Sequence, residues 1–168
     1  MDAPFVVKIV SSRKDVGKTL FAERLVRELS ERGVKVASLK HIHHGRLDID
    51  SGKDTERMFL AGSSISIGYA GDTSMVLMRG ASLDYLLRLV NDARPDVIVV
   101  EGFKDMRPEG FTVYIASRGD VGSCDPSSVD LATSMEPGIV EELKSRGCNA
   151  LRFDEAVSYV LSLALAIR

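Results

Sequence analysis

The sequence has little net charge and no apolar run long enough to cross a membrane. Its formal net charge is −2, so it has no general electrostatic attraction for nucleic acid or an anionic membrane, and any anion site must be local. The C-terminal apolar run YVLSLALAI (159–167) is about half as long as a bilayer requires. We therefore expect neither a nucleic-acid nor a membrane partner, and we expect this run to form a buried closing helix.

Cysteine is scarce as well. Cys124 and Cys148 are far apart and do not have the spacing of a metal motif. We expect two separate thiols in a reducing cytosol rather than a disulfide. The N-terminus lacks a basic segment followed by an apolar run, which argues against a signal peptide. These absences favour a cytoplasmic protein.

What the chain does contain is an alternation of short β-rich runs and amphipathic segments, with no repeat, low-complexity stretch or linker. This alternation predicts one α/β domain over residues 1–168, with a mostly parallel sheet flanked by helices. The turn AGDT between two short β-rich runs adds a small β-hairpin. The strands are expected at 5–10, 34–40, 64–69, 74–78, 96–103 and 112–117, and the helices from the GKT to Gly33 and at 54–62, 83–93, 137–147 and 154–167.

The segment SSRKDVGKT (11–19) ends like a phosphate-binding loop and lies between a predicted buried strand and an amphipathic helix. In such a loop, backbone N–H groups and the helix N-terminus surround a phosphate. A lysine reaches the β- and γ-phosphates, and a Ser or Thr hydroxyl binds Mg²⁺. Lys18 and Thr19 match these two roles. The nucleotide-binding residues predicted from this segment are Ser12, Arg13, Lys14, Asp15, Val16, Gly17, Lys18 and Thr19.

One position departs from the pattern G-x-x-x-x-G-K-[ST], because Ser12 stands where the first glycine is expected. A serine forced into a glycine-only conformation would cost about 1–2 kcal/mol. The alternative is a slightly different turn that serine adopts without strain. Neither outcome abolishes binding, although a loop that has decayed into a simple helix start remains the competing interpretation.

A carboxylate lies near the end of the predicted strand, in the segment DVIVVEG (96–102). Phosphate-loop enzymes place an acidic residue at the end of a hydrophobic strand, where it holds Mg²⁺ or its water. Glu101 occupies this place. We therefore predict Thr19 and Glu101 as metal-binding residues and Lys18 and Glu101 as catalytic residues. The competing interpretation of Glu101 is a carboxylate that only faces solvent.

All three histidines lie in KHIHHG (40–45), at the carboxyl end of the second predicted strand, the edge where ligands bind in open α/β sheets. A zinc site would need carboxylates such as Asp48 and Asp50 to join them. Anion recognition by Lys40 and the histidines, and a polar loop without a ligand, are the alternatives. The following loop adds Lys53 and Arg57, which suit a second anion, and Asp54, which suits a helix N-cap.

Together these segments resemble the molybdopterin-guanine dinucleotide biosynthesis protein B (MobB) family. Three stretches carry the resemblance: SSRKDVGKTLFAERLVRELSERGVKVASLKHIHH (11–44), DIDSGKDTERMFLAGS (48–63) and DVIVVEGFK (96–104). The resemblance implies a P-loop NTPase-like fold and a GTP-binding accessory protein acting late in molybdenum cofactor biosynthesis. Such a protein assists the partner that joins a guanine nucleotide to molybdopterin.

The resemblance also implies a weak GTPase that uses Mg²⁺ and forms homodimers. Residues that it implies for the nucleotide or cofactor loop are His41, His44, Asp50, Lys53, Asp54 and Arg57. Two other functions fit the same loop: a non-hydrolysing adapter with a degenerate P-loop, and a P-loop kinase or ligase of a small metabolite. No NKxD motif is present to read guanine; Asp120 in SRGD (117–120) is the substitute that we consider.

Overall fold

The computed structural model describes residues 3–42, 53–103 and 109–167. The chain divides into two compact units: one comprises the residues up to His41 and from Ala93 on, and the other comprises Ile42–Asp92. Each is described by itself, and the single domain expected from the sequence stays a prediction. Within the described residues, no helix combines the length and apolar character that crossing a bilayer requires.

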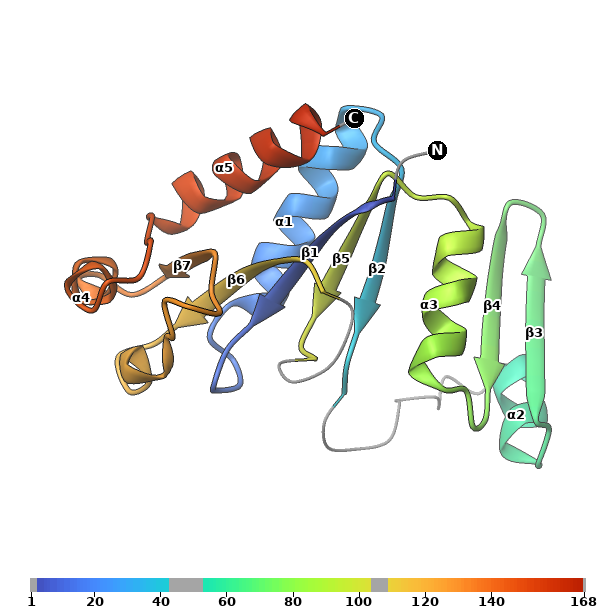
Figure 1. Cartoon of the computed structure of the whole chain (residues 1–168). Helices are drawn as coiled ribbons and strands as arrows, with labels where there is room; N and C mark the ends of the chain where they lie inside the picture. Colours follow the sequence, from blue (N-terminus) through green and yellow to red (C-terminus); the bar gives the residue numbers. More distant parts are fainter. Residues whose placement is uncertain (1–2, 43–52, 104–108, 168) are drawn as a thin grey trace. The chain divides into compact units, whose positions relative to one another are not determined.

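The first unit is built on a five-stranded sheet in which every neighbouring pair is parallel (Figure 1). The strand order is β2-β5-β1-β6-β7. Helices flank this sheet, so the α/β, mostly parallel fold predicted from the sequence is confirmed. The strands are β1 (Phe5–Val10), β2 (Val36–Lys40), β5 (Val97–Glu101), β6 (Phe111–Ala116) and β7 (Leu131–Ser134).

The register of the sheet brings three strand ends together. Glu101, the last residue of β5, pairs with Ile9 of β1 on one side and with Lys40 of β2 on the other. On the far side of β1, Val10 pairs with Tyr114 of β6. The segments that follow these strands therefore leave the same edge of the sheet, which is where open α/β folds bind ligands.

Helices α1 (Lys18–Glu31) and α5 (Phe153–Ala166) pack together, α1 against β1, β2 and β5 and α5 against β7. The apolar side of α1 places Phe21, fully buried, edge-on against Phe153, with ring centroids 5.4 Å apart. Arg24 and Asp154 form an ion pair between the two helices. The C-terminal apolar run thus forms the buried closing helix that the sequence predicts.

A second apolar cluster includes Tyr114 and residues of η1 (Val121–Ser123) and α4 (Ile139–Ser145). The sequence did not predict η1 or β7. β7 has only four residues, LATS, and two of them are Ala and Ser, so it lacks the β-branched run that marked the other strands. Pairing with β6 and complete burial hold it in the sheet.

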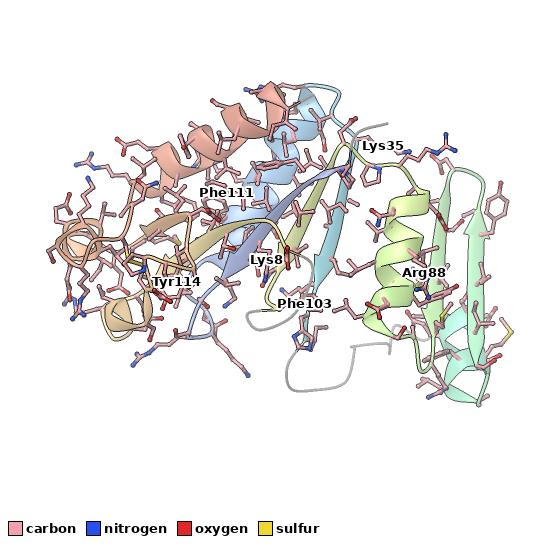
Figure 2. The ribbon with its side chains drawn as sticks, viewed as in Figure 1. Lys8, Lys35, Arg88, Phe103, Phe111 and Tyr114 are labelled. Carbon is pink, nitrogen blue, oxygen red and sulfur yellow. A yellow bond between two sulfur atoms is a disulfide. The ribbon has the colours of Figure 1, made fainter. Side chains whose placement is uncertain are left out.

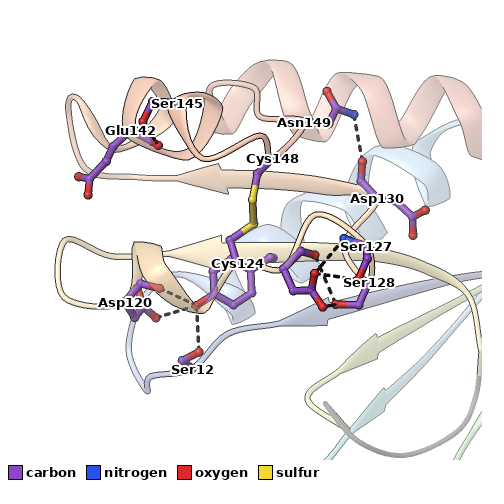
Figure 3. The surroundings of a disulfide bond; sticks show 12 residues. Ser12, Asp120, Cys124, Ser127, Ser128, Asp130, Glu142, Ser145, Cys148 and Asn149 are labelled. Atoms are coloured by element: carbon purple, nitrogen blue, oxygen red, sulfur yellow. Dashed lines mark hydrogen bonds between the residues drawn. A yellow bond between two sulfur atoms is a disulfide. The ribbon is translucent and has the colours of Figure 1, made fainter.

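The cysteines in this cluster are joined, so the expectation of two separate thiols was wrong. Cys124 follows η1 and Cys148 follows α4, and they form a disulfide although 24 residues separate them in sequence (Figure 3). Both side chains are buried, 7% and 4% exposed. Sequence spacing did not reveal the pair, because it depends on how η1 and α4 pack against each other.

The second unit contains α2 (Asp54–Leu60), β3 (Ile65–Ala70), β4 (Thr73–Met78) and α3 (Leu83–Asp92). β3 and β4 form the predicted antiparallel hairpin, and Ser66 donates a hydrogen bond to the Thr55 carbonyl of α2 at 2.7 Å. The predicted N-cap is wrong by one residue, because Lys53 precedes the first helical residue, Asp54. Exposed apolar side chains of the hairpin are Ile65, Ile67, Tyr69 and Val76.

Candidate nucleotide-binding site

The loop between β1 and α1 takes a turn that serine tolerates at position 12. Among the described residues, the non-glycine residues with positive φ are Asp15, Arg94 and Phe103, so Ser12 lies outside the left-handed region. The strain considered for Ser12 therefore does not arise, and the alternative turn is the one observed. Gly17 does need to be glycine, since its φ is 101° and a Cβ there would lie 2.5 Å from Met135 Sδ.

The amide groups of this loop are available to a ligand. Phe21 N–H donates to the Gly17 carbonyl at 2.9 Å and closes the first turn of α1. Within the described ranges, no backbone carbonyl accepts a hydrogen bond from the N–H groups of residues 13–20. Successive unpaired N–H groups at a helix N-terminus form an anion-binding concavity. Phosphate binding by these amides stays a prediction.

Lys18 folds back over this loop. Its Nζ donates to Ser11 Oγ at 2.6 Å and to the Arg13 carbonyl at 2.9 Å. Burial lowers the pKa of the Lys18 ammonium below its ordinary value, and the nearby carboxylates of Glu101 and Asp15 offset only part of this shift. The Ser11 hydroxyl and the Arg13 carbonyl hold the Lys18 ammonium beside the loop, and phosphate oxygens can replace these two neutral acceptors.

Thr19 and Glu101, which the sequence predicted as metal-binding residues, meet at the end of β5, and their metal-binding role stays a prediction. The Thr19 hydroxyl lies 3.0 Å from both carboxylate oxygens of Glu101. Lys40 is the third member of the group, because its Nζ lies 3.2 Å from Glu101 Oε2 and 3.1 Å from Thr19 Oγ1. A cation, an alcohol and a carboxylate thus converge beside the phosphate loop.

These residues suit Mg²⁺. The ion prefers oxygen ligands, and it is commonly held by one or two carboxylates together with substrate phosphates rather than by a cage of protein groups alone. Thr19 and Glu101 provide an alcohol and a carboxylate oxygen at one point. No cluster of three or more His, Cys, Asp or Glu side chains that would hold a metal occurs in the described part of the chain.

The loop after β6 supports the phosphate loop from the side. Ser12 Oγ lies 2.9 Å from the phenol oxygen of Tyr114, which is 1% exposed (Figure 3). A Cβ built on Gly119 would lie 2.5 Å from Arg13 Cζ, so the guanidinium packs against this glycine. On the other side, Val16 packs against the core that α1 and α5 share. Lys14 and Asp15 are exposed.

Asp120 does not suit the base-reading role that we considered for it. One carboxylate oxygen accepts hydrogen bonds from the Ser117 N–H at 2.6 Å and the Ser117 hydroxyl at 3.0 Å, and the other accepts from Tyr114 at 3.2 Å. The residue is 6% exposed. Its acceptor capacity is used to close the turn 117–120, so it is a structural residue.

The histidine segment is described only in part. The His41 N–H donates to the Glu101 carbonyl at 2.9 Å, and its ring stacks on Phe103 with centroids 4.6 Å apart. His44 and Asp50 lie outside the described residues, so the zinc and anion interpretations stay predictions. Lys53, Asp54 and Arg57 belong to the other unit, and their place in the site stays a prediction too.

Sequence reasoning left Tyr114 out of the site and considered Lys40 only for anion recognition with the histidines, not as a partner of Glu101 and Thr19. Lys40 had a visible signal, since it begins the KHIHH motif at a strand end and is a short-range neighbour of the predicted histidines. Tyr114 had none, because its contact with Ser12 joins residues 102 positions apart in the sequence.

The chain was compared with known protein families and sequences. The family model for molybdopterin guanine dinucleotide synthesis protein B (MobB) matches residues 6–133. A probable molybdopterin-guanine dinucleotide biosynthesis adapter protein of Bacillus subtilis is 35% identical over 121 residues, which cover 70% of this chain and 69% of that protein. The corresponding adapter protein of Haemophilus influenzae is 40% identical over 92 residues, 52% of this chain and 51% of its own length.

Solved structures agree on the fold. The crystal structure of Bacillus subtilis MobB superposes with a TM-score of 0.72 at 23% identity, covering 94% of this chain and 96% of that one. A MobB homologue from Bacillus stearothermophilus gives 0.69 at 20% identity, covering 96% and 98%. With the family match over residues 6–133 and the Bacillus subtilis relative, these findings place the chain in the MobB family.

Proposed function

We propose that this chain is a GTP-binding adapter protein of molybdopterin guanine dinucleotide biosynthesis, and that residues 12–19 bind the phosphates of the nucleotide. The family and its curated relatives support a role in molybdenum cofactor biosynthesis. The observation that carries the nucleotide proposal is the meeting of the loop before α1, Lys18 and the Thr19–Glu101 pair at one sheet edge. That convergence is hard to explain as a simple helix start.

Each group has one task in this proposal. The loop amides and Lys18 bind the β- and γ-phosphates, where the ammonium exchanges the Ser11 and Arg13 oxygens for phosphate oxygens. Thr19 and Glu101 hold Mg²⁺. The ion, when bound, neutralises phosphate charge and polarises the γ-phosphoryl group. We expect Mg²⁺-dependent GTP hydrolysis to be slow; an adapter that binds GTP without hydrolysing it is the second form of the proposal.

The partners follow from the adapter role. We expect the chain to act with molybdopterin or with the guanylyltransferase that uses it, as a homodimer in the cytoplasm. Each of these stays a prediction. Light scattering of the purified chain measures its mass in solution, and a monomer at micromolar concentration would contradict the homodimer.

The first experiment is a calorimetric titration with GTP and ATP, with and without Mg²⁺. We expect saturable GTP binding below millimolar concentration, and weaker ATP binding. Absence of saturable binding of either nucleotide would end the nucleotide proposal. Incubation with GTP and chromatography of the products then separates the two forms: GDP that accumulates with Mg²⁺ indicates a slow GTPase, and unchanged GTP indicates a non-hydrolysing adapter.

A further inference from the structure

Lys40 lies between the two groups that suit a metal. Its ammonium is 3.2 Å from Glu101 Oε2 and 3.1 Å from Thr19 Oγ1. The contact is built into the sheet, because Lys40 and Glu101 are register partners at the ends of β2 and β5. The Glu101 side chain is 12% exposed, whereas that of Lys40 is 53% exposed. The carboxylate is thus fixed and partly shielded from water, and the ammonium approaches it from the solvent side.

The Lys40 ammonium contacts the same Thr19 and Glu101 oxygen atoms that a metal ion would bind. The Thr19 hydroxyl directs its proton toward Glu101 and accepts a hydrogen bond from Lys40, so both of its functions are engaged. A divalent cation and an ammonium at the same carboxylate repel each other strongly, since like charges a few Å apart in a partly buried site are poorly screened. The two cations therefore compete for one place.

We propose that Lys40 is a resident counter-cation of the Thr19–Glu101 pair, which Mg²⁺ displaces only when a nucleotide phosphate is present to receive the ammonium. The inference rests on the proposed function. Lysine suits the role because its ammonium is a compact charge on a flexible stem with three donors. Thr19 directly follows Lys18, so the proposal has the Lys40 side chain turn from Thr19 toward the phosphate bound by Lys18. Magnesium and nucleotide then bind together rather than separately.

The test begins with the protein free of nucleotide. Mn²⁺ serves as the probe, and its binding to the wild type, Lys40→Met and Lys35→Met is measured by electron paramagnetic resonance. We expect Lys40→Met to bind Mn²⁺ about tenfold more tightly than the wild type. Lys35→Met is the matched control: Lys35 immediately precedes the start of β2, away from Glu101, and donates to the Ala93 carbonyl (Figure 2). Equal Mn²⁺ affinities of Lys40→Met and the wild type would overturn the proposal.

Two further variants locate the effect. Lys40→Arg keeps the charge and should retain the weak Mn²⁺ binding of the wild type, whereas a loss of contact alone would not be rescued by arginine. Glu101→Gln added to Lys40→Met should remove the gain, and a gain that persists would place the metal elsewhere and overturn the proposal. Circular dichroism checks each fold, and Lys40→Gln replaces Lys40→Met if the latter does not fold.

A second measurement separates this inference from the proposed function. GTP binding is titrated in excess EDTA and in Mg²⁺. The wild type should retain measurable binding in EDTA. The ratio of the GTP affinity in Mg²⁺ to that in EDTA should rise about tenfold in Lys40→Met, because Mg²⁺ no longer has to displace an ammonium from Glu101. An unchanged ratio would count against the role of Lys40. A wild type that binds no nucleotide would overturn the proposed function instead, and the Mn²⁺ titration would still decide where Lys40 acts.

Discussion

Two loops leave the same edge of the sheet, and their polar groups are used in opposite ways. In the loop after β6, residues 117–120, the buried carboxylate of Asp120 accepts three hydrogen bonds from side-chain and backbone donors of the protein itself. In the loop after β1, residues 11–17, the N–H groups of residues 13–17 have no backbone acceptor among the described residues, and Lys18 donates hydrogen bonds to two neutral oxygens. We therefore expect the first loop to be rigid and the second to receive a ligand, although both contain Ser, Arg and Asp.

The largest expected effect comes from replacing Lys18, which directly follows the loop after β1. Lys18→Ala should lower GTP affinity about a thousandfold, because it removes about two charge-assisted hydrogen bonds, together about 4 kcal/mol. Calorimetry with Mg²⁺·GTP measures the change. Lys14→Ala, at an exposed position of the same loop, is the matched control and should cost less than about threefold. Equal losses in the two variants would mean that only the general charge of the loop matters.

The next effect concerns the supporting loop, which the disulfide follows directly. Reducing the Cys124–Cys148 bond, which closes a separation of 24 residues, should lower the free energy of unfolding by about 3.5 kcal/mol in the chain-entropy model. Urea denaturation with and without dithiothreitol measures this. The double variant Cys124→Ser with Cys148→Ser should show no effect of reductant. Two free thiols in the denatured, unreduced protein would contradict the bond.

Replacing Asp120 tests most directly whether the loop after β6 contributes to stability rather than to nucleotide binding. Asp120→Ala should lower the free energy of unfolding by about 2 kcal/mol, since the buried Tyr114 hydroxyl and Ser117 N–H lose their acceptor. The ratio of GTP to ATP affinity should stay unchanged. Arg118→Ala is the control from the same loop, because its ion pair with Glu136 is exposed and contributes little. A changed GTP preference at unchanged stability would make Asp120 a base reader after all.

Much of this arrangement could be predicted from the sequence where the signal is local. β1, α1 and the GKT are contiguous. The continuous β-rich apolar run of β1 and the 3.6-residue apolar period of α1 specify a strand, a loop and a helix without help from the rest of the chain. The Thr19–Glu101 pair was also predictable, because parallel strands bring their carboxyl ends to one edge.

What could not be predicted depends on packing between distant segments. The Ser12–Tyr114 contact and the Cys124–Cys148 bond join residues whose neighbours in sequence carry no sign of each other. β7 escaped prediction because pairing and burial, rather than its own propensity, make it a strand. Asp120 shows the same limit for function: its exposed-looking sequence context, SRGD, gives no hint that its carboxylate is buried and used.

The smallest expected effect links the two loops through Tyr114. Tyr114→Phe removes the hydroxyl that accepts from Ser12 and donates to Asp120, and should lower the free energy of unfolding by about 1 kcal/mol near neutral pH. Tyr85→Phe, at a 40% exposed position, is the control and should change stability by less than about 0.5 kcal/mol. Chemical denaturation at pH 7 measures both.

The pH dependence of the stability difference between the wild type and Tyr114→Phe tests whether the buried Tyr114 hydroxyl causes it. Burial raises the pKa of the Tyr114 phenol above its ordinary value, with a further contribution from the charge of Asp120. A group whose folded-state pKa is raised contributes its stability in full below the unfolded pKa of about 10 and loses it as the pH rises through the folded value. The wild type should therefore lose stability above about pH 10 more steeply than Tyr114→Phe, so the two curves converge. Parallel stability curves for the wild type and Tyr114→Phe would mean that the phenol is hydrated and that Tyr114 does not stabilise the loop after β1 through Ser12.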